Sequence, residues 1–214
     1  MLALVDRREA GFHCPNTYRS WLELAQRPEV KRVVLTSFWQ GYFDFSQPST
    51  IAINGSPVTA DRVPEIFNAT AKDLKRIADA GKEVVVLGPI PTSKTFDPEL
   101  LVAEGRIPGL GGRRQTINYG SITSAAFQNQ IRVVDPELRR LAETVGATLL
   151  QPAAYLCKDS NCPADARGKP LYHDWNHLRP FATKEYLPFF PALVQLDSLG
   201  ALQRYAQHQL KQPE

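Results

Sequence analysis

The segment Glu83-Val84-Val85-Val86-Leu87-Gly88-Pro89 decides the fold class that the sequence predicts. Four apolar residues in succession, three of them β-branched, predict a short strand that is buried on both faces and ends at the Gly-Pro pair. Residues 63–80, just before it, carry apolar side chains with a helical period, and Gly81 follows as the residue that ends the helix. A helix that leads into a doubly buried strand is typical of a parallel sheet covered by helices.

Two further apolar runs extend this pattern in both directions along the chain. Residues 33–39 form a β-branched run, and residues 147–150 form a shorter one that Pro152 ends. Their order, with helices between them, predicts an α/β fold with a parallel sheet covered on both faces. We expect the other segments to be helices over residues 16–25, 121–130 and 136–145 and after Pro180, and loops over residues 41–57 and 92–115, the second long and mobile.

The composition is that of one globular domain. The chain has 214 residues, of which 43% are hydrophobic and 22% charged, so it is long enough for a single well-packed core. A net charge of +3 is too small to favour nucleic acid or an anionic membrane as a partner. No apolar run reaches the roughly 18 residues of a membrane span, and the short apolar stretch after Met1 is no signal peptide.

The strongest chemical signal is the segment Tyr172-His173-Asp174-Trp175-Asn176-His177-Leu178-Arg179-Pro180. Asp174 stands three residues before His177, and on a turn that enters a helix these two positions share one side. The carboxylate can then accept the Nδ1 proton of the imidazole and leave Nε2 to take a proton from a nucleophile. The alternative is that Asp174 only caps the last helix and His177 lies exposed in its first turn.

The predicted topology gives this pair a functional location. In parallel sheets covered by helices, functional groups gather at the carboxyl ends of the strands. Those ends correspond to residues 37–42, 88–91 and 151–155, and the last of them leads towards Asp174 and His177. The pair therefore falls where the catalytic site of an α/β domain is expected.

Three segments, taken in order, carry a family resemblance. They are Val33 to Tyr42, Val84 to Pro91, and Tyr155 to Leu178, the last of which contains two cysteines, a Pro-Leu-Tyr and an Asp-x-x-His-Leu. In this order they resemble the SGNH hydrolase-type domain, in particular the version fused behind the membrane domain of acyltransferase-3 proteins, which O-acylate cell-surface polysaccharides. The resemblance implies a flavodoxin-like three-layer α/β/α sandwich and a Ser-His-Asp triad for acyl transfer or ester hydrolysis. Asp174 would be the orienting acid and His177 the general base, and no cofactor is implied.

The same resemblance implies a setting and partners. It implies an extracytoplasmic domain on the periplasmic face of a membrane, an N-terminal acyltransferase membrane domain, and an acylated (acetylated) or acceptor glycan as substrate. In that compartment Cys157 and Cys162 would form a short-loop disulfide. Trp39 and Tyr42 are candidates to line an acyl or sugar pocket, because aromatic rings stack on pyranose faces, and core packing at a strand end is the alternative.

The sequence departs from the family pattern at the nucleophile. SGNH domains open with a strand that ends in Gly-Asp-Ser, and this sequence contains no Gly-Asp-Ser. The run that begins at Val33 resembles a later strand of the family. We therefore expect residues 1–214 to be a single, N-terminally incomplete domain, whose first strand and serine would fall before Met1. Ser37 and Ser121 lie in no nucleophile motif and are interpreted as structural hydroxyls.

Two alternatives to an active enzyme stay open. The first is a catalytically inactive relative that binds a glycan without turning it over. The second is a zinc site, because Cys157, Cys162, His173 and His177 approach a Cys2His2 spacing. Against zinc, residues 163–170 lack the apolar side chains of a zinc-finger core, and the interval between Cys162 and His173 is short.

Overall fold

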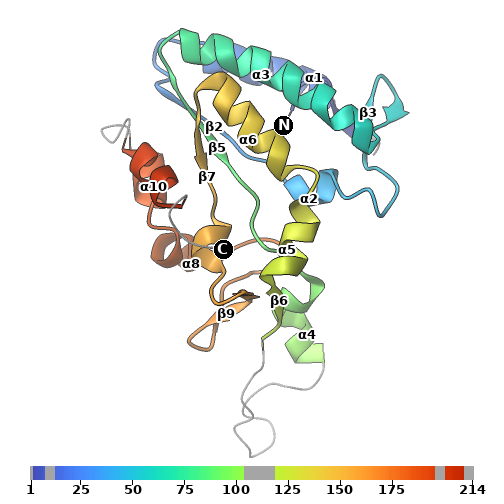
Figure 1. The fold of residues 1–214 in the computed structure, drawn as a ribbon, viewed down its shortest axis with the longest axis vertical. Coiled ribbons are helices and arrows are strands. Elements are labelled where there is room, and N and C mark those ends of the chain that lie inside the picture. Colours follow the sequence, from blue (N-terminus) through green and yellow to red (C-terminus); the bar gives the residue numbers. More distant parts are fainter. Residues whose placement is uncertain (1, 8–12, 104–118, 196–200, 210–214) are drawn as a thin grey trace, which may run out of the picture. The chain divides into compact units, whose positions relative to one another are not determined.

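The structure is a computed structural model that describes residues 2–7, 13–103, 119–195 and 201–209. The chain divides into two compact units, the first made of residues 1–89, 130–151 and 192–214 and the second of residues 90–129 and 152–191. The predicted α/β class is confirmed, and the parallel sheet belongs to the first unit (Figure 1).

Three parallel strands form the sheet of the first unit, in the order β2 (Arg32–Leu35), β5 (Glu83–Leu87) and β7 (Thr148–Leu150). Val84 of β5 pairs with Val33 of β2, and Val86 pairs with Leu149 of β7. The three consecutive valines of β5 are all buried, as a strand with neighbours on both sides and helices on its faces requires. The first predicted strand was too long, because β2 ends at Leu35 and Trp39 begins a short helix, α2 (Trp39–Tyr42).

Helices with apolar faces pack on this sheet. They are α3 (Val63–Asp79), α6 (Asp135–Val145) and α10 (Leu202–Gln209), whereas α1 (Cys14–Ala25) contacts strand β1 (Asp6–Arg7). The buried side chains of α3 recur every three or four residues, and α3 contacts both β5 and α6. Helix α10 contacts β7, and Figure 1 shows it on the side of β7 that is opposite to α6. Gly146 ends α6 with a φ of 73°, a left-handed conformation that glycine adopts without a steric cost.

Two of the three strands of a small antiparallel sheet lie in residues 41–57, which the sequence predicted to be a loop. Strands β1 (Asp6–Arg7), β3 (Ile51–Ile53) and β4 (Ser56–Pro57) pair in the order β1-β3-β4, and the 3-10 turn η1 (Ala60–Arg62) follows. Asn54 and Gly55 connect β3 to β4 with φ values of 51° and 78°. An Asn-Gly pair with positive φ makes the tight turn that hairpins favour, and this signal was missed.

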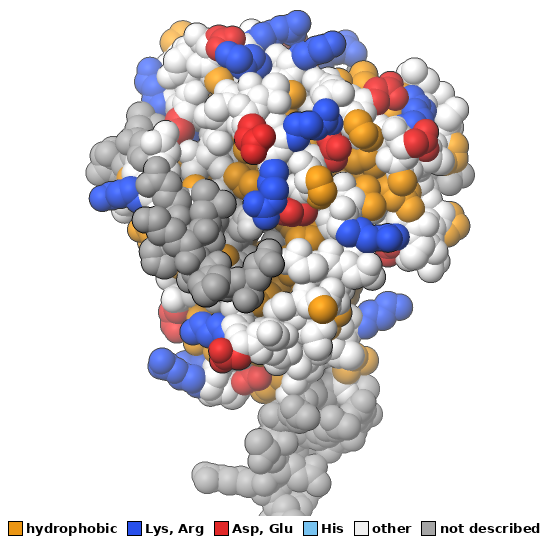
Figure 2. Space-filling model, viewed as in Figure 1, with side chains coloured by type: hydrophobic (Ala, Val, Ile, Leu, Met, Phe, Trp, Pro, Cys, Tyr) orange, Lys and Arg blue, Asp and Glu red, His pale blue; other side chains and the backbone are white. Residues whose placement is uncertain are grey.

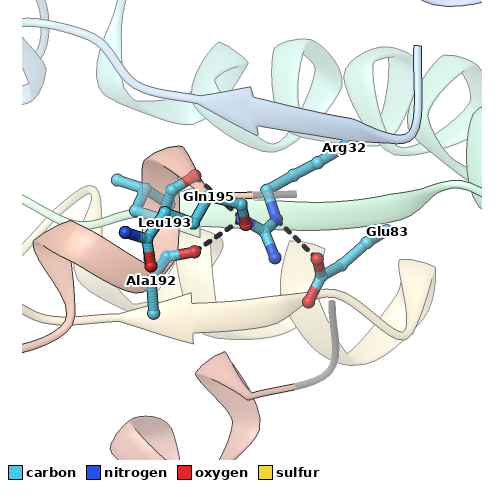
Figure 3. A network of polar contacts seen from close by, with 5 residues as sticks. All are labelled: Arg32, Glu83, Ala192, Leu193 and Gln195. Carbon is cyan, nitrogen blue, oxygen red and sulfur yellow. Dashed lines mark hydrogen bonds and ion pairs between the residues drawn. The ribbon is translucent and has the colours of Figure 1, made fainter. Parts of the chain in front are cut away.

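A buried arginine joins the sheet of the first unit to the C-terminal segment of the same unit. Arg32, at the start of β2, donates from Nε to Glu83 Oε2 at 2.5 Å. Its Nη1 donates to the carbonyl oxygens of Ala192, Leu193 and Gln195 at 2.6, 2.9 and 3.0 Å (Figure 3). The guanidinium therefore bonds to one carboxylate and three main-chain carbonyls at once.

The second unit is built from short elements. In chain order they are η2 (Lys94–Phe96), α4 (Pro98–Ala103), β6 (Ser121–Thr123), α5 (Ser124–Ile131), α7 (Ala153–Leu156), β8 (Asn161–Pro163), β9 (Asp165–Ala166), β10 (Lys169–Pro170), α8 (Pro180–Tyr186) and α9 (Phe190–Val194). Strand β6 pairs with β8, and β9 with β10. The predicted helix over residues 121–130 is thus wrong in its first three residues, and the predicted loop over residues 92–115 contains η2 and α4. Residues 104–118 of that loop lie outside the described residues.

The core of the second unit is small and partly aromatic. Its buried members are Phe96, Ala164, Leu171, Tyr172 and Ala182. Phe96 and Tyr172 have their ring centroids 4.7 Å apart. Over the face drawn in Figure 2, Lys and Arg side chains are interspersed with Asp and Glu. None of the helices in the described ranges combines the length and the apolar character that crossing a bilayer needs.

Candidate functional site

Residues 172–178 of the second unit form a closed loop, which we call the Asp-His loop. An isolated antiparallel bridge pairs Tyr172 with Leu178, and the amide of His173 donates to the carbonyl of His177 at 2.7 Å. Tyr172 anchors the base of this loop, because its buried hydroxyl donates to the carbonyl of Pro91 at 2.8 Å. Burial raises the pKa of the Tyr172 phenol, which therefore stays protonated and acts as a donor.

Two more groups fix the loop from outside. Arg179 donates from Nε to the carbonyl of Tyr172 and from its backbone amide to the carbonyl of Leu171, each at 2.8 Å. The amide of Ser93 donates to the carbonyl of Trp175 at 3.2 Å. The loop is therefore tied at its base and near its tip to main-chain groups of its own unit. The sequence analysis missed these anchors. The only signal for them was that Tyr172 and Arg179 lie on either side of the segment that contains Asp174 and His177.

The carboxylate of Asp174 organises the backbone inside the loop. Its Oδ1 accepts from the amides of Asn176 and His177 at 2.9 and 2.8 Å. This is the local turn in which an Asp side chain takes the place of a backbone acceptor. The alternative, in which Asp174 only caps the helix after Pro180, is wrong, because α8 begins at Pro180 and its N-cap is Arg179. The two residues lie together on a turn that precedes the helix.

The second carboxylate oxygen holds the imidazole. Asp174 Oδ2 lies 2.8 Å from His177 Nδ1, and 72% of the His177 side chain is exposed. Desolvation on its own raises the pKa of Asp174. The amide of Asn176 and the hydrogen bonds with His177 outweigh it and hold this pKa below its ordinary value. The carboxylate therefore stays ionised, favours the tautomer with the proton on Nδ1, and leaves Nε2 facing solvent as an acceptor.

The two cysteines of the predicted pair are bonded to each other. Cys157 and Cys162 form a disulfide that closes the turn before β8, and Cys162 is buried. Sulfurs joined in a disulfide are not available as thiolate ligands. In the described part of the chain, no group of three or more His, Cys, Asp and Glu side chains is placed to hold a metal ion. The arrangement of Cys157, Cys162, His173 and His177 is therefore unlike a Cys2His2 zinc site.

Trp39 and Tyr42, the aromatic candidates for substrate binding, belong to the first unit. Only 1% of Trp39 is exposed, and its indole N–H donates to the carbonyl of Leu87 at the end of β5 at 2.8 Å. The ring also packs against Phe67 of α3, with centroids 6.1 Å apart. A ring buried in this way offers no face to a sugar, so Trp39 is corrected to a core residue. Tyr42 is half-buried, and its contact with a substrate stays a prediction.

The serines in the described ranges do not complete a triad with Asp174 and His177. Ser121 is exposed in β6, Ser37 is half-buried after β2, and no serine among the described residues hydrogen-bonds to His177. A cavity of about 370 Å³ opens in the first unit beside α1 and α3, where Tyr18, Arg19, Lys72 and Arg76 are among its lining residues. None of the residues predicted for catalysis lines it.

These features define an α/β domain that presents a carboxylate–imidazole pair suited to acid–base chemistry. A family model described as an SGNH domain fused to AT3 domains matches residues 2–192, and the chain belongs to this family. The family resemblance predicted from the sequence, with its flavodoxin-like fold, is thereby confirmed.

The solved structures similar to this chain include an acetyltransferase domain. It is the periplasmic domain of a lipopolysaccharide acetyltransferase from Salmonella ser. Paratyphi A, with a TM-score of 0.49 and 15% identity. The similarity covers 85% of this chain and 63% of that one. No curated protein matches this chain in sequence.

Proposed function

We propose that this chain is an acyltransferase- or esterase-type domain that acts on O-acyl groups, acetyl above all, of a cell-surface polysaccharide. The observation that carries the proposal is the 2.8 Å contact between Asp174 Oδ2 and His177 Nδ1, which leaves the other imidazole nitrogen exposed. Membership in the SGNH family supports this assignment of roles. The proposal gives the chain the acid and base members of a Ser-His-Asp triad.

Each member of the pair has a defined part in the chemistry. Asp174 orients the imidazole and stabilises the imidazolium that forms during the reaction. His177 Nε2 takes the proton of a serine hydroxyl as that oxygen attacks an acyl carbonyl, and it returns the proton to the departing oxygen. The sequence holds no Gly-Asp-Ser, so the proposal assigns no serine of this chain as the nucleophile.

The proposed setting is extracytoplasmic, next to an acyltransferase membrane domain. The family description, in which these domains are fused to AT3 domains, supports the partner. The Cys157–Cys162 disulfide supports the compartment, because disulfides persist in oxidising environments and are rare in the cytosol.

Nitrogen NMR of the His177 ring tests the carboxylate–imidazole geometry. We expect the tautomer with its proton on Nδ1, held by Asp174. In Asp174→Asn the side-chain amide can donate to the ring, so the tautomer should switch to Nε2–H. A ring that populates Nε2–H in the unmodified chain would contradict the assigned roles.

Ester hydrolysis by the purified chain tests the chemistry. Because no nucleophile is assigned, we expect little turnover of p-nitrophenyl acetate or of an O-acetylated polysaccharide, and we expect His177→Ala to remove what turnover there is. His173→Ala is the matched control, since His173 is an exposed imidazole of the same loop without an assigned role. Robust hydrolysis that survives His177→Ala would overturn the proposal.

A second candidate function is glycan binding without turnover. The observation that favours it is the lack of a Gly-Asp-Ser nucleophile in the sequence. Saturable glycan binding that is the same in the unmodified chain and in His177→Ala, together with no ester hydrolysis by either, would favour this candidate over the first.

A further inference from the structure

The three tryptophans of the chain differ sharply in their surroundings. Trp39 is buried, and Trp21 is half-buried with its ring stacked on Tyr18. Trp175 has 40% of its surface exposed, and it is the only Phe, Tyr or Trp in the exposed class among the residues whose side chains are described. Exposed indoles are uncommon, because Trp carries the largest apolar surface of any side chain.

The backbone that carries this exposed indole is held on both sides. Trp175 lies inside the turn that Asp174 Oδ1 closes with the amides of Asn176 and His177. Its own carbonyl accepts from the amide of Ser93. The indole is therefore displayed on the same fixed turn as the carboxylate and the imidazole, and it is the residue next to Asp174 in the chain.

A ligand that suits this turn has an apolar face and polar edges. A pyranose ring meets this description, because its axial C–H groups form an apolar face and its hydroxyls remain at the rim. A flat indole offers a larger area for such stacking than the rings of Phe or Tyr. The side chain also loses little conformational entropy when a sugar binds. A simple alkyl ester lacks this extended face, so the exposed ring selects the sugar rather than the acyl group.

We propose that Trp175 is the platform on which the sugar ring of an O-acylated glycan stacks, so that its ester lies beside His177. This inference rests on the proposed function and adds the residue that would recognise the carbohydrate. It replaces Trp39, the tryptophan that the sequence favoured for this role and that the structure buries.

The test is an NMR titration of the full ¹⁵N-labelled chain, read at the indole N–H signals and at the His177 ring. The probes are the methyl pyranosides of glucose, galactose, rhamnose and N-acetylglucosamine, methyl 6-O-acetyl-glucopyranoside, and ethyl acetate as the ester without a sugar. We expect the Trp175 signal to shift saturably with at least one pyranoside and not with ethyl acetate. The Trp39 signal serves as the internal reference, since its N–H is bonded to Leu87.

Variants separate stacking from a general loss of structure. Trp175→Ala should weaken pyranoside binding by about fivefold, the equivalent of one aromatic stacking contact, and Trp175→Phe should restore part of it. Leu24→Ala, which shortens an exposed side chain on α1, is the control and should leave binding unchanged.

Each other outcome overturns the inference in a distinguishable way. If His177 responds to methyl 6-O-acetyl-glucopyranoside while Trp175 responds to no pyranoside, the platform is refuted and the proposed function stands. Equal shifts with ethyl acetate would make Trp175 a nonspecific apolar contact. If no pyranoside shifts either residue, the platform is refuted, and ester hydrolysis then decides the proposed function separately.

Discussion

The unit that contains the parallel sheet buries a continuous set of aliphatic side chains, whereas the unit that contains Asp174 and His177 depends on local cross-links. In the first unit, the valines of β5 and the apolar face of α3 are buried together with α6. In the second, the strands have two or three residues, a disulfide joins the end of α7 to β8, and one loop is held by bonds from side chains to main-chain carbonyls. The buried core of the first unit stabilises the fold, and the cross-links of the second unit hold the Asp-His loop in place.

This difference has a physical origin. Burial of apolar area is non-directional, so a strand or helix with the right period contributes wherever it packs. A catalytic pair needs particular atoms at particular distances, and hydrogen bonds provide the direction that burial lacks. Substitutions in the first unit should therefore affect folding, whereas substitutions in the second unit should affect the geometry of the Asp-His loop.

The largest effect is expected from Arg32→Ala. Only 3% of the Arg32 side chain is exposed, and its removal leaves Glu83 and three carbonyls without this donor. Breaking one side of a buried ion pair typically costs about 3–5 kcal/mol, and we expect a loss of that size in the free energy of unfolding of the first unit. Urea unfolding followed by the indole N–H NMR signal of the buried Trp39 measures it.

The matched control is Arg76→Ala, because 79% of the Arg76 side chain is exposed beside Asp73. We expect a change of less than about 1 kcal/mol for this surface pair. Equal losses for the two arginines would contradict the view that the network of Arg32 ties the C-terminal segment to the sheet.

A somewhat smaller effect is expected from Leu74→Ala. Leu74 is fully buried on α3, the helix that contacts both β5 and α6. The substitution removes apolar contacts and leaves a cavity, for which the typical cost is about 2–5 kcal/mol, measured in the same urea experiment. The NMR signals of Asp174 and His177 should keep their positions below the unfolding transition. Movement of those signals in the folded variant would show that a cavity in the first unit also disturbs the Asp-His loop.

Most of the first unit could be predicted from the sequence because its signals are periodic. The valine run of β5, the spacing along α3 and the glycines after α3 and α6 each specify an element by local chemistry alone. The errors arose where the period was short or ambiguous. Residues 33–39 continue as an apolar run after β2 has ended, because Trp39 is buried as part of helix α2 and not as part of a strand.

The site was predicted in part, for a related reason. Asp174 and His177 could be found because their spacing has a chemical meaning within four residues. The groups that hold them, Pro91, Ser93 and Tyr172, are distant or featureless in sequence, and three-dimensional contacts alone relate them. Trp39 was a candidate for substrate contact, with core packing as the alternative, and the sequence alone does not state whether this side chain is buried.

Removal of the disulfide should affect the second unit and spare the first. Closing a loop as short as that between Cys157 and Cys162 contributes about 2 kcal/mol on the chain-entropy model. The double variant Cys157→Ala, Cys162→Ala should therefore lose about this much stability in signals from the second unit, such as that of Ala164. The unfolding transition observed at Trp39 should not move. A shift of that transition by the same amount would show that the disulfide stabilises both units.

A series of backbone hydrogen bonds connects the residues after β8 to the Asp-His loop, so the double cysteine variant should also change hydrogen exchange there. The amide of Ala164 donates to the carbonyl of Gly120, the amide of Leu171 to Ala164, and the amide of Arg179 to Leu171, each at 2.8 Å. The residues after β8 are thereby linked step by step to the end of the Asp-His loop. We expect faster hydrogen exchange at these three amides in the double variant, and unchanged exchange would show that the ladder stands without the disulfide.

The smallest effect is expected on the titration of Asp174, which reports directly on the hydrogen bonds that hold its carboxylate. Desolvation favours the protonated acid, but the amide of Asn176 and the bonds from His177 outweigh it, so the pKa of Asp174 in the folded chain lies below its ordinary value. A depressed carboxylate pKa means that the contribution of this group to stability is present above the unfolded-state pKa and is lost as the pH falls through the folded-state value.

Carbon NMR of the Asp174 carboxyl, followed from neutral pH into acid, measures this pKa directly. In His177→Ala two of the lowering interactions are lost in full, those of the imidazole, whereas the Asn176 amide still donates. The pKa should therefore rise. An unchanged pKa in His177→Ala would contradict the hydrogen bond between Asp174 Oδ2 and His177 Nδ1. The contacts of Tyr172, Arg179 and Ser93 would then hold the loop without any contribution from that pair.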